Sequence, residues 1–160
     1  MVPGMRRTVL SLLVLAVALT AVAVAPAADR AVKSTELAVV QEMNRARAEH
    51  GLAPLRTDRT LRIAARSWSA DMMRTGVFTH GDFSSRMARF GIRGTLAGEN
   101  LAWGVGSKGT PAELVRGWLN STPHRANLLR PSFHRLGVGA MVGTFAGYDG
   151  VVLVTADFAG

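Results

Sequence analysis

Two kinds of hydrophobic pattern follow each other along the chain, and their order restricts the fold. Apolar residues recur at helical spacing over residues 61–72, which predicts a helix that Asp58 caps and Gly76 ends. A strand–turn–strand pattern closes the chain, with residues 136–142 and 151–158 as the two strands. Helices that precede an antiparallel hairpin indicate the α+β class.

A second long helix is expected ahead of this one. It begins at Ser34 or Thr35 and runs to about His50, where Gly51 stops it. Spacing of three to four residues places four of its apolar side chains on a core-facing side: Leu37, Val40, Met43 and Ala46.

Shorter elements fill the region between the long helices and the hairpin. They are a helical turn over 85–90, an extended segment over 98–103, a helix that ends near Asn120 and a helical piece over 124–129. Thr110 and Glu113 have the spacing of a capping box, and Pro111 stands at the first helical position. These signals predict that the third of these elements begins at Pro111.

Composition limits the function classes. With 160 residues the chain forms one domain, and zero cysteines exclude a disulfide scaffold, a thiol nucleophile and a cysteine-based metal site. The net charge is +8, but the arginines are spread without a run, so no nucleic-acid partner is expected. The positive balance is compatible with peripheral association with anionic wall polymers or lipid headgroups, and is treated as a background property. The oligomeric state cannot be read from the sequence.

The N-terminus predicts export. Arg6 and Arg7 precede an apolar run over residues 8–24, and Ala25-Pro26-Ala27 has the small-residue pattern of a cleavage site. We therefore expect a signal peptide over residues 1–27, a short tail over 28–34 and one domain over 35–160, with a secreted product. The alternative is an uncleaved membrane anchor, which the shortness of the apolar run disfavours.

Four polar residues are candidates for a functional site. His80 follows the predicted 59–75 helix, and Glu99 lies in an apolar segment, where a buried carboxylate needs a partner. Ser121, His124 and Glu99 include the residue types of a nucleophile, a base and an orienting acid. However, Ser121 also fits a simpler role, at a helix stop followed by a new cap. These three are therefore weak catalytic candidates.

Several short motifs occur in one order along the chain: Met43-Asn44-x-x-Arg47, Gly51-Leu52-x-Pro54-Leu55, Ala64-Ala65 with Trp68 and Asp71-Met72, Phe78-Thr79-His80, Gly98-Glu99-Asn100-Leu101-Ala102, Trp118-Leu119-Asn120-Ser121-x-x-His124-Arg125-x-Asn127-Leu128-Leu129, Gly137-Val138-Gly139 and Thr155-Ala156-Asp157-Phe158. In these motifs, from about Thr35 to the C-terminus, the chain resembles the CAP superfamily (cysteine-rich secretory proteins, antigen 5 and pathogenesis-related 1). It is most similar to the cysteine-free bacterial SCP-domain branch.

The resemblance implies an α-β-α sandwich, with a three-stranded antiparallel sheet between helical layers. It also implies a cleft that holds two His and two Glu in many members, able to bind a divalent metal. His80 and Glu99 match one His and one Glu, whereas Ser121 and about Leu153 stand where the other two belong. His124 is a hypothetical replacement that would give a three-ligand set for zinc or magnesium.

The alternative for His80 and Glu99 is a structural hydrogen bond that ties a loop to the sheet, and we favour it over a metal site. The resemblance implies a non-enzymatic module that binds a lipid, a wall polymer or a protein at the envelope or in the medium. A metal-dependent or Ser/His hydrolase, of peptidase type, is the alternative function.

Other motif residues are expected to be structural. Trp68, Trp103 and Trp118 are assigned to the core. Four polar residues are expected to lock loops by buried hydrogen bonds: Asn44, Arg47, Asn100 and Asn127. Arg125 is expected to pair with an acid near the cleft.

Overall fold

One sheet forms the centre of the molecule. The computed structural model describes residues 27–92 and 96–160. Strands β2 (Ala97–Val105), β3 (Arg135–Phe145) and β4 (Tyr148–Ala159) pair antiparallel, with β4 in the middle. The two-residue strand β1 (Arg56–Thr57) adds to the outer edge of β3 in parallel, so the order is β1-β3-β4-β2. The α+β class and the three antiparallel strands are confirmed, and β1 is a fourth strand.

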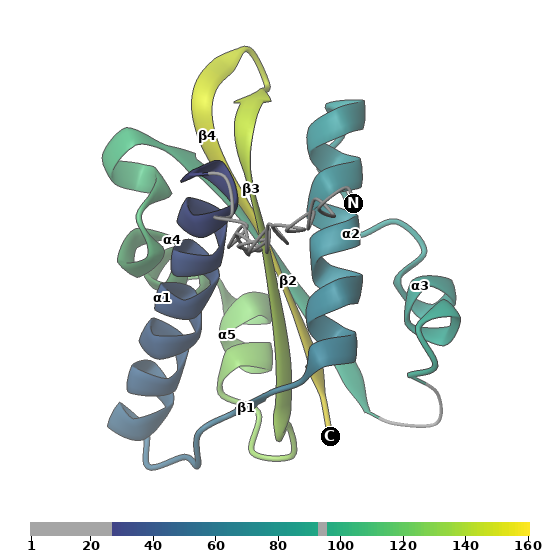
Figure 1. Ribbon diagram of the computed structural model, residues 1–160. Helices are drawn as coiled ribbons and strands as arrows, with labels where there is room; N and C mark the ends of the chain where they lie inside the picture. The colour runs from purple at the N-terminus through teal and green to yellow at the C-terminus, as the bar shows by residue number, and fades with distance from the viewer. Residues whose placement is uncertain (1–26, 93–95) are drawn as a thin grey trace, which may run out of the picture.

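Helices cover both faces of this sheet (Figure 1). Helices α1 (Ala27–Glu49), α4 (Pro111–Leu119) and α5 (Thr122–Leu128) lie on one side, and α2 (Arg59–Thr75) and α3 (Phe83–Arg89) lie on the other. A 3-10 turn, Gly106–Gly109, joins β2 to α4. The sandwich expected from the resemblance is therefore present.

The core divides between the two faces of the sheet. On the α1 side, Trp118 is fully buried and its indole Nε1 donates to the Leu101 carbonyl at 2.9 Å. On the α2 side, Met72, Phe145 and Leu153 pack together, with Trp68 and Trp103 half-buried at the border. The core assignment is thus met fully by Trp118 and partly by the other two tryptophans. Burial on both faces explains why β4 from Val151 onward is almost uninterruptedly apolar.

Arg47 fixes the loops that follow α1 and α5. Its side chain is buried, and its guanidinium donates to four backbone carbonyls, those of Ala53, Leu128, Arg130 and Phe133. Asn44 exchanges two hydrogen bonds with the backbone of Leu55. The loop-locking role expected for both side chains is confirmed.

Helix α2 lies directly against the backbone of β3. Its start at the Asp58 cap and its end at left-handed Gly76 are as expected. A Cβ placed on Gly139 would lie 2.2 Å from the Arg66 amide nitrogen, and one on Gly137 would lie 2.1 Å from the Leu61 carbonyl carbon. Only glycine allows this approach, because both obstacles are backbone atoms that cannot turn aside.

The start of α1 differs from the expectation. The helix begins at Ala27, so residues 28–34 are helical and do not form a tail. Asp29 and Lys33 form an i,i+4 ion pair at 2.6 Å in this first part, which favours helix. Ser34 does not cap: its hydroxyl donates back to the Ala31 carbonyl, as does that of Thr35.

The face of α1 is also rotated from the expected one. Met43 and Ala46 are buried and Val40 is half-buried, but Leu37 is 58% exposed. Glu36 is buried in its place, because its carboxylate pairs with Arg66 of α2 and accepts from the Ala140 amide. A buried ionic contact has overridden the apolar periodicity.

Two local expectations are wrong in detail. Helix α4 begins at Pro111 without a capping box: the Thr110 hydroxyl donates to the Ser107 carbonyl, and Glu113 pairs with Arg116. The hairpin strands extend beyond the expected 136–142 and 151–158, and the chain reverses at Ala146-Gly147, where both residues have positive φ. Paired positive φ values suit the right-handed twist of the strands on either side.

No helix in the described part of the chain has the length and apolar character needed to cross a membrane. The expected signal peptide falls almost wholly on residues 1–26, which lie outside the described residues. Ala27, before the expected cleavage point, is the first residue of α1.

The contact between α2 and β3 predicts the effect of adding one methyl group. We expect Gly139→Ala to lower the free energy of unfolding by about 2–3 kcal/mol, because α2 must move off the strand. Gly117→Ala is the matched control: no atom lies within 4 Å of its Cβ position on α4, so it should stabilise by about 0.5–1 kcal/mol. Urea unfolding measures both. Equal midpoints for Gly139→Ala and wild type would contradict the close approach.

Candidate functional site

The hydrogen bond expected between His80 and Glu99 is present. Glu99 lies in β2, and His80 lies in the loop between α2 and α3. His80 Nδ1 is 2.7 Å from Glu99 Oε1. The side chain of Glu99 is only 2% exposed and that of His80 is 55% exposed, so the pair joins the interior to the surface.

Arg86 occupies the other oxygen of this carboxylate. It projects from α3, its side chain is buried, and its Nη2 donates to Glu99 Oε2. Its Nη1 donates to the His80 carbonyl at 3.2 Å, and its guanidinium lies 4.4 Å from the centroid of the Trp68 ring. Both oxygens of Glu99 are therefore engaged, one by a histidine and one by a guanidinium.

A second acid lies beside Glu99. Asp157 is the direct partner of Glu99 in the β2–β4 register and is completely buried. Its Oδ1 is 3.6 Å from Arg86 Nη2, and neither of its oxygens has a hydrogen-bond partner within the described ranges. Two buried acids that share one guanidinium leave one negative charge uncompensated.

Burial and the neighbouring charges set the protonation of these acids. Burial, together with the charge of Glu99, raises the pKa of Asp157 well above its usual range. Burial also raises the pKa of Glu99, to about 7, against the lowering effect of Arg86. The two acids titrate as a unit, and a proton on Asp157 lets it act as a donor toward Glu99.

His124 lies near His80 but is not part of this network. Its backbone carbonyl accepts from Asn100 Nδ2, and Asn127 Nδ2 donates to the Glu99 carbonyl and to Asn100 Oδ1. Burial and the proximity of His80 lower the pKa of His124. Burial and the charge of Arg86 lower the pKa of His80. Both shifts favour the neutral form of the ring. The loop-locking role of the two asparagines is confirmed.

The remaining sequence candidates serve the backbone. Ser121 precedes α5, where its carbonyl accepts from the Arg125 amide at 2.8 Å. Among the described residues its hydroxyl makes no hydrogen bond with His124. Within residues 27–92 and 96–160, Arg125 pairs with no acid, contrary to the expectation: its Nη2 lies 3.0 Å from His50 Nε2, just after α1.

These residues do not fit a divalent metal. The described ranges contain no group of three or more His, Asp or Glu side chains arranged to hold one. Of the three-residue set, only His80 and Glu99 are in contact, and both carboxylate oxygens are already bonded. Zinc sites normally use three or four protein ligands.

Arg86 and Asp157 are the site residues that sequence reasoning missed. A signal for Asp157 existed, because it stands in an apolar strand just as Glu99 does, and the same requirement for a partner applies. No such signal marked Arg86, one of the two arginines in the short helix α3.

Comparison with protein families assigns this architecture. The model of the CAP group, the cysteine-rich secretory protein family, matches residues 40–158. The chain belongs to this family. The Bacillus subtilis (strain 168) protein YkwD is 41% identical to this CAP chain over 117 residues, which are 70% of this chain and 44% of YkwD. The membrane protein YlbC of the same strain is 34% identical over 111 residues, 66% of this chain and 31% of YlbC. The chain thus spans less than half the length of these relatives.

Solved structures have the same fold. An extracellular SCP-domain protein from Bacillus anthracis matches with a TM-score of 0.69 and 29% identity, over 82% of this chain and 42% of that one. An outer surface protein of Borrelia burgdorferi matches with a TM-score of 0.69 and 22% identity, over 79% and 92% of the two chains. Together with the absence of cysteine, these findings place the chain in the bacterial SCP-domain type.

The buried acid pair predicts a pH dependence. A raised pKa means that the folded protein holds more protons than the unfolded chain, so the free energy of unfolding falls as pH rises from about 4 to 7 and above. Asp157→Asn removes part of this loss and keeps a donor toward Glu99. We expect its stability relative to wild type to increase with pH, by at most about 1.4 kcal/mol per pH unit.

Urea unfolding at pH 4, 5.5, 7 and 8 measures this difference. Asp149→Asn is the control, because it removes an exposed acid of the β3–β4 hairpin that accepts from the Thr144 hydroxyl. A constant difference between Asp157→Asn and wild type over the four pH values would show that Asp157 binds no extra proton in the folded protein.

Proposed function

We propose that this CAP-domain protein is exported and acts as a non-enzymatic binding module, at the cell envelope or in the medium. The observation that carries the proposal is the state of Glu99, whose two oxygens are held by His80 and Arg86. A general base must be reachable by the proton it removes. The Glu99 side chain is 2% exposed, and each of its oxygens already contacts a protein partner. Glu99 therefore has a structural role, joining β2 to the His80 loop and to α3.

Export is supported by the sequence pattern before Ala27 and by the likeness to an extracellular SCP-domain protein. Association with the envelope is supported by charge. Residues 28–160 contain 17 Lys and Arg against 11 Asp and Glu, a net charge of +6. Such a surface is attracted to anionic wall polymers and lipid headgroups.

Expression of the full chain in a bacterial host tests export. We expect protein in the medium or loosely bound to cells, with an intact mass that starts at Ala28, and envelope-bound material that high salt releases. Ala27→Arg should block cleavage and leave the full-length mass in the membrane fraction, which makes it the matched control. Full-length wild-type protein that remains inside the cell would contradict the proposal.

The hydrolase and metal alternative retains one observation in its favour, because His80 and His124 are neighbours. Since Glu99 is already bonded, we expect no micromolar zinc affinity in a calorimetric titration of the protein. Micromolar zinc binding that His80→Ala abolishes and His50→Ala leaves unchanged would support the metal-site hypothesis. Hydrolysis that is lost in both Ser121→Ala and His124→Ala would support the hydrolase hypothesis.

A further inference from the structure

Three exposed arginines follow one another where β1 passes into α2. Arg56 is in β1, and Arg59 and Arg62 are at the start of α2. All three side chains are exposed, and we call them together the arginine surface. They lie at the outer edge of the sheet, away from the Glu99 site.

The charge of the arginine surface is not balanced by acids. None of its three members takes part in the ion pairs found among residues 27–92 and 96–160. Asp58 lies between them in the sequence, but its carboxylate accepts from two backbone amides of α2 and pairs with Arg135 at 3.3 Å. The one acid within this stretch is therefore already engaged.

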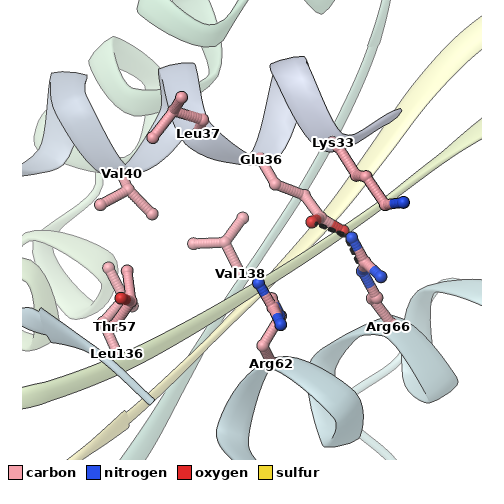
Figure 2. Close-up of a pocket in the computed structure, with 9 residues that line it drawn as sticks. All are labelled: Lys33, Glu36, Leu37, Val40, Thr57, Arg62, Arg66, Leu136 and Val138. Atoms are coloured by element: carbon pink, nitrogen blue, oxygen red, sulfur yellow. Dashed lines mark hydrogen bonds and ion pairs between the residues drawn. The ribbon is translucent and has the colours of Figure 1, made fainter. Parts of the chain in front are cut away.

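The next arginine of α2 differs in this respect. Spacing of three and four residues places Arg59, Arg62 and Arg66 on one side of the helix. Figure 2 shows Arg62 and Arg66 on α2, with the carboxylate of Glu36 joined to Arg66. The unbalanced positive charge is thus confined to β1 and the start of α2.

This placement lowers the stability of the fold. Arg56 is the direct neighbour of Arg135 in the β1–β3 register, and Arg59 and Arg62 are three residues apart on α2. Like charges at such positions destabilise strand pairs and helices. Exposed side chains offer no packing in return, so a negatively charged ligand gives a better reason for these arginines than folding does.

The arrangement favours a linear ligand over a compact one. Arg62 lines the groove between α1 and α2, whereas Arg56 lines a separate hollow together with His134 and Arg135. The arginines therefore do not share one cavity that could enclose a small anion. A polymer that carries an anion in every repeat can contact all three in turn.

We infer that the arginine surface binds a linear wall polymer of polyol phosphate, with successive phosphodiester groups on Arg56, Arg59 and Arg62. A guanidinium binds a phosphate through two parallel hydrogen bonds. Side chains three residues apart on a helix start about 5–6 Å from one another, an interval that the polyol unit between two phosphates can span. This inference rests on the proposed binding function and names its ligand and contact surface.

Calorimetric titration of the purified protein with soluble poly(glycerol phosphate), at several salt concentrations, tests the assignment. We expect saturable binding that weakens as salt rises, because each contacted phosphate releases condensed counterions. The double variant Arg59→Gln/Arg62→Gln should bind about tenfold more weakly or worse at low salt, because two charge-assisted contacts are lost. The slope of log K against log salt should become shallower by about 1.4, since each contact to a single strand contributes about 0.7.

The matched control removes the same charge elsewhere. Arg30→Gln/Arg89→Gln replaces one exposed arginine of α1 and one of α3, neither of which is in an ion pair within the described ranges. It should bind the polymer with the affinity and the salt slope of wild type. Equal weakening in the two double variants would show that net charge alone attracts the polymer, and would overturn the inference.

Two further probes separate the polymer from other phosphodiesters. Neither hollow beside the arginines is lined by an aromatic side chain on which a base could stack, so single-stranded DNA with the same number of phosphates should bind no more tightly. Tighter binding of DNA would assign the surface to nucleic acid. Binding to phosphatidylglycerol vesicles that needs Arg59 and Arg62, without binding to the soluble polymer, would assign it to a membrane. Either result overturns the inference.

Envelope association separates this inference from the proposed function. If poly(glycerol phosphate) fails to bind but the exported wild-type protein still sediments with envelopes, the ligand assignment is wrong and the binding function stands. If the protein is neither exported nor envelope-bound, yet polymer binding follows Arg59 and Arg62, the arginine surface stands and the proposed location is wrong.

Discussion

Burial of Arg86 between Glu99 and Asp157 is the interaction on which the joining of α3, the His80 loop and the sheet depends. The two acids are opposite one another on β2 and β4, and the guanidinium comes from a helix outside the sheet. Removal of Arg86 would leave the two buried acids without a counter-charge, at a cost of about 3–5 kcal/mol. The residues that would supply chemistry in an open cleft therefore hold the two layers together.

Features with local causes could be predicted from the sequence. Helix α2 combines a continuous apolar stripe with an aspartate cap and a glycine stop, and all three signals are in adjacent residues. The buried roles of Arg47 and Asn44 followed from motifs whose spacing matched a known family. The His80–Glu99 contact followed from the need of an acid in an apolar strand for a partner.

Features caused by distant residues could not be predicted. Glu99 and Asp157 are 58 positions apart and meet only through the register of β2 on β4. Glu36 is buried because Arg66, from another helix, reaches its carboxylate, and this contact turned Leu37 outward against the helical pattern. Likewise, the Thr110 hydroxyl donates to the Ser107 carbonyl of the preceding turn and therefore does not cap α4.

The glycine contact of β3 with α2 has a consequence for molecular recognition. Side chains can repack and let a helix shift, but Gly137 and Gly139 place main chain against main chain, with nothing to repack. Helix α2 is thereby held at a fixed distance from β3, and the Glu36 contacts with Arg66 and Ala140 tie α1 to the same two elements. A surface built on elements packed in this way is preorganised, because a partner that binds there does not have to order them first.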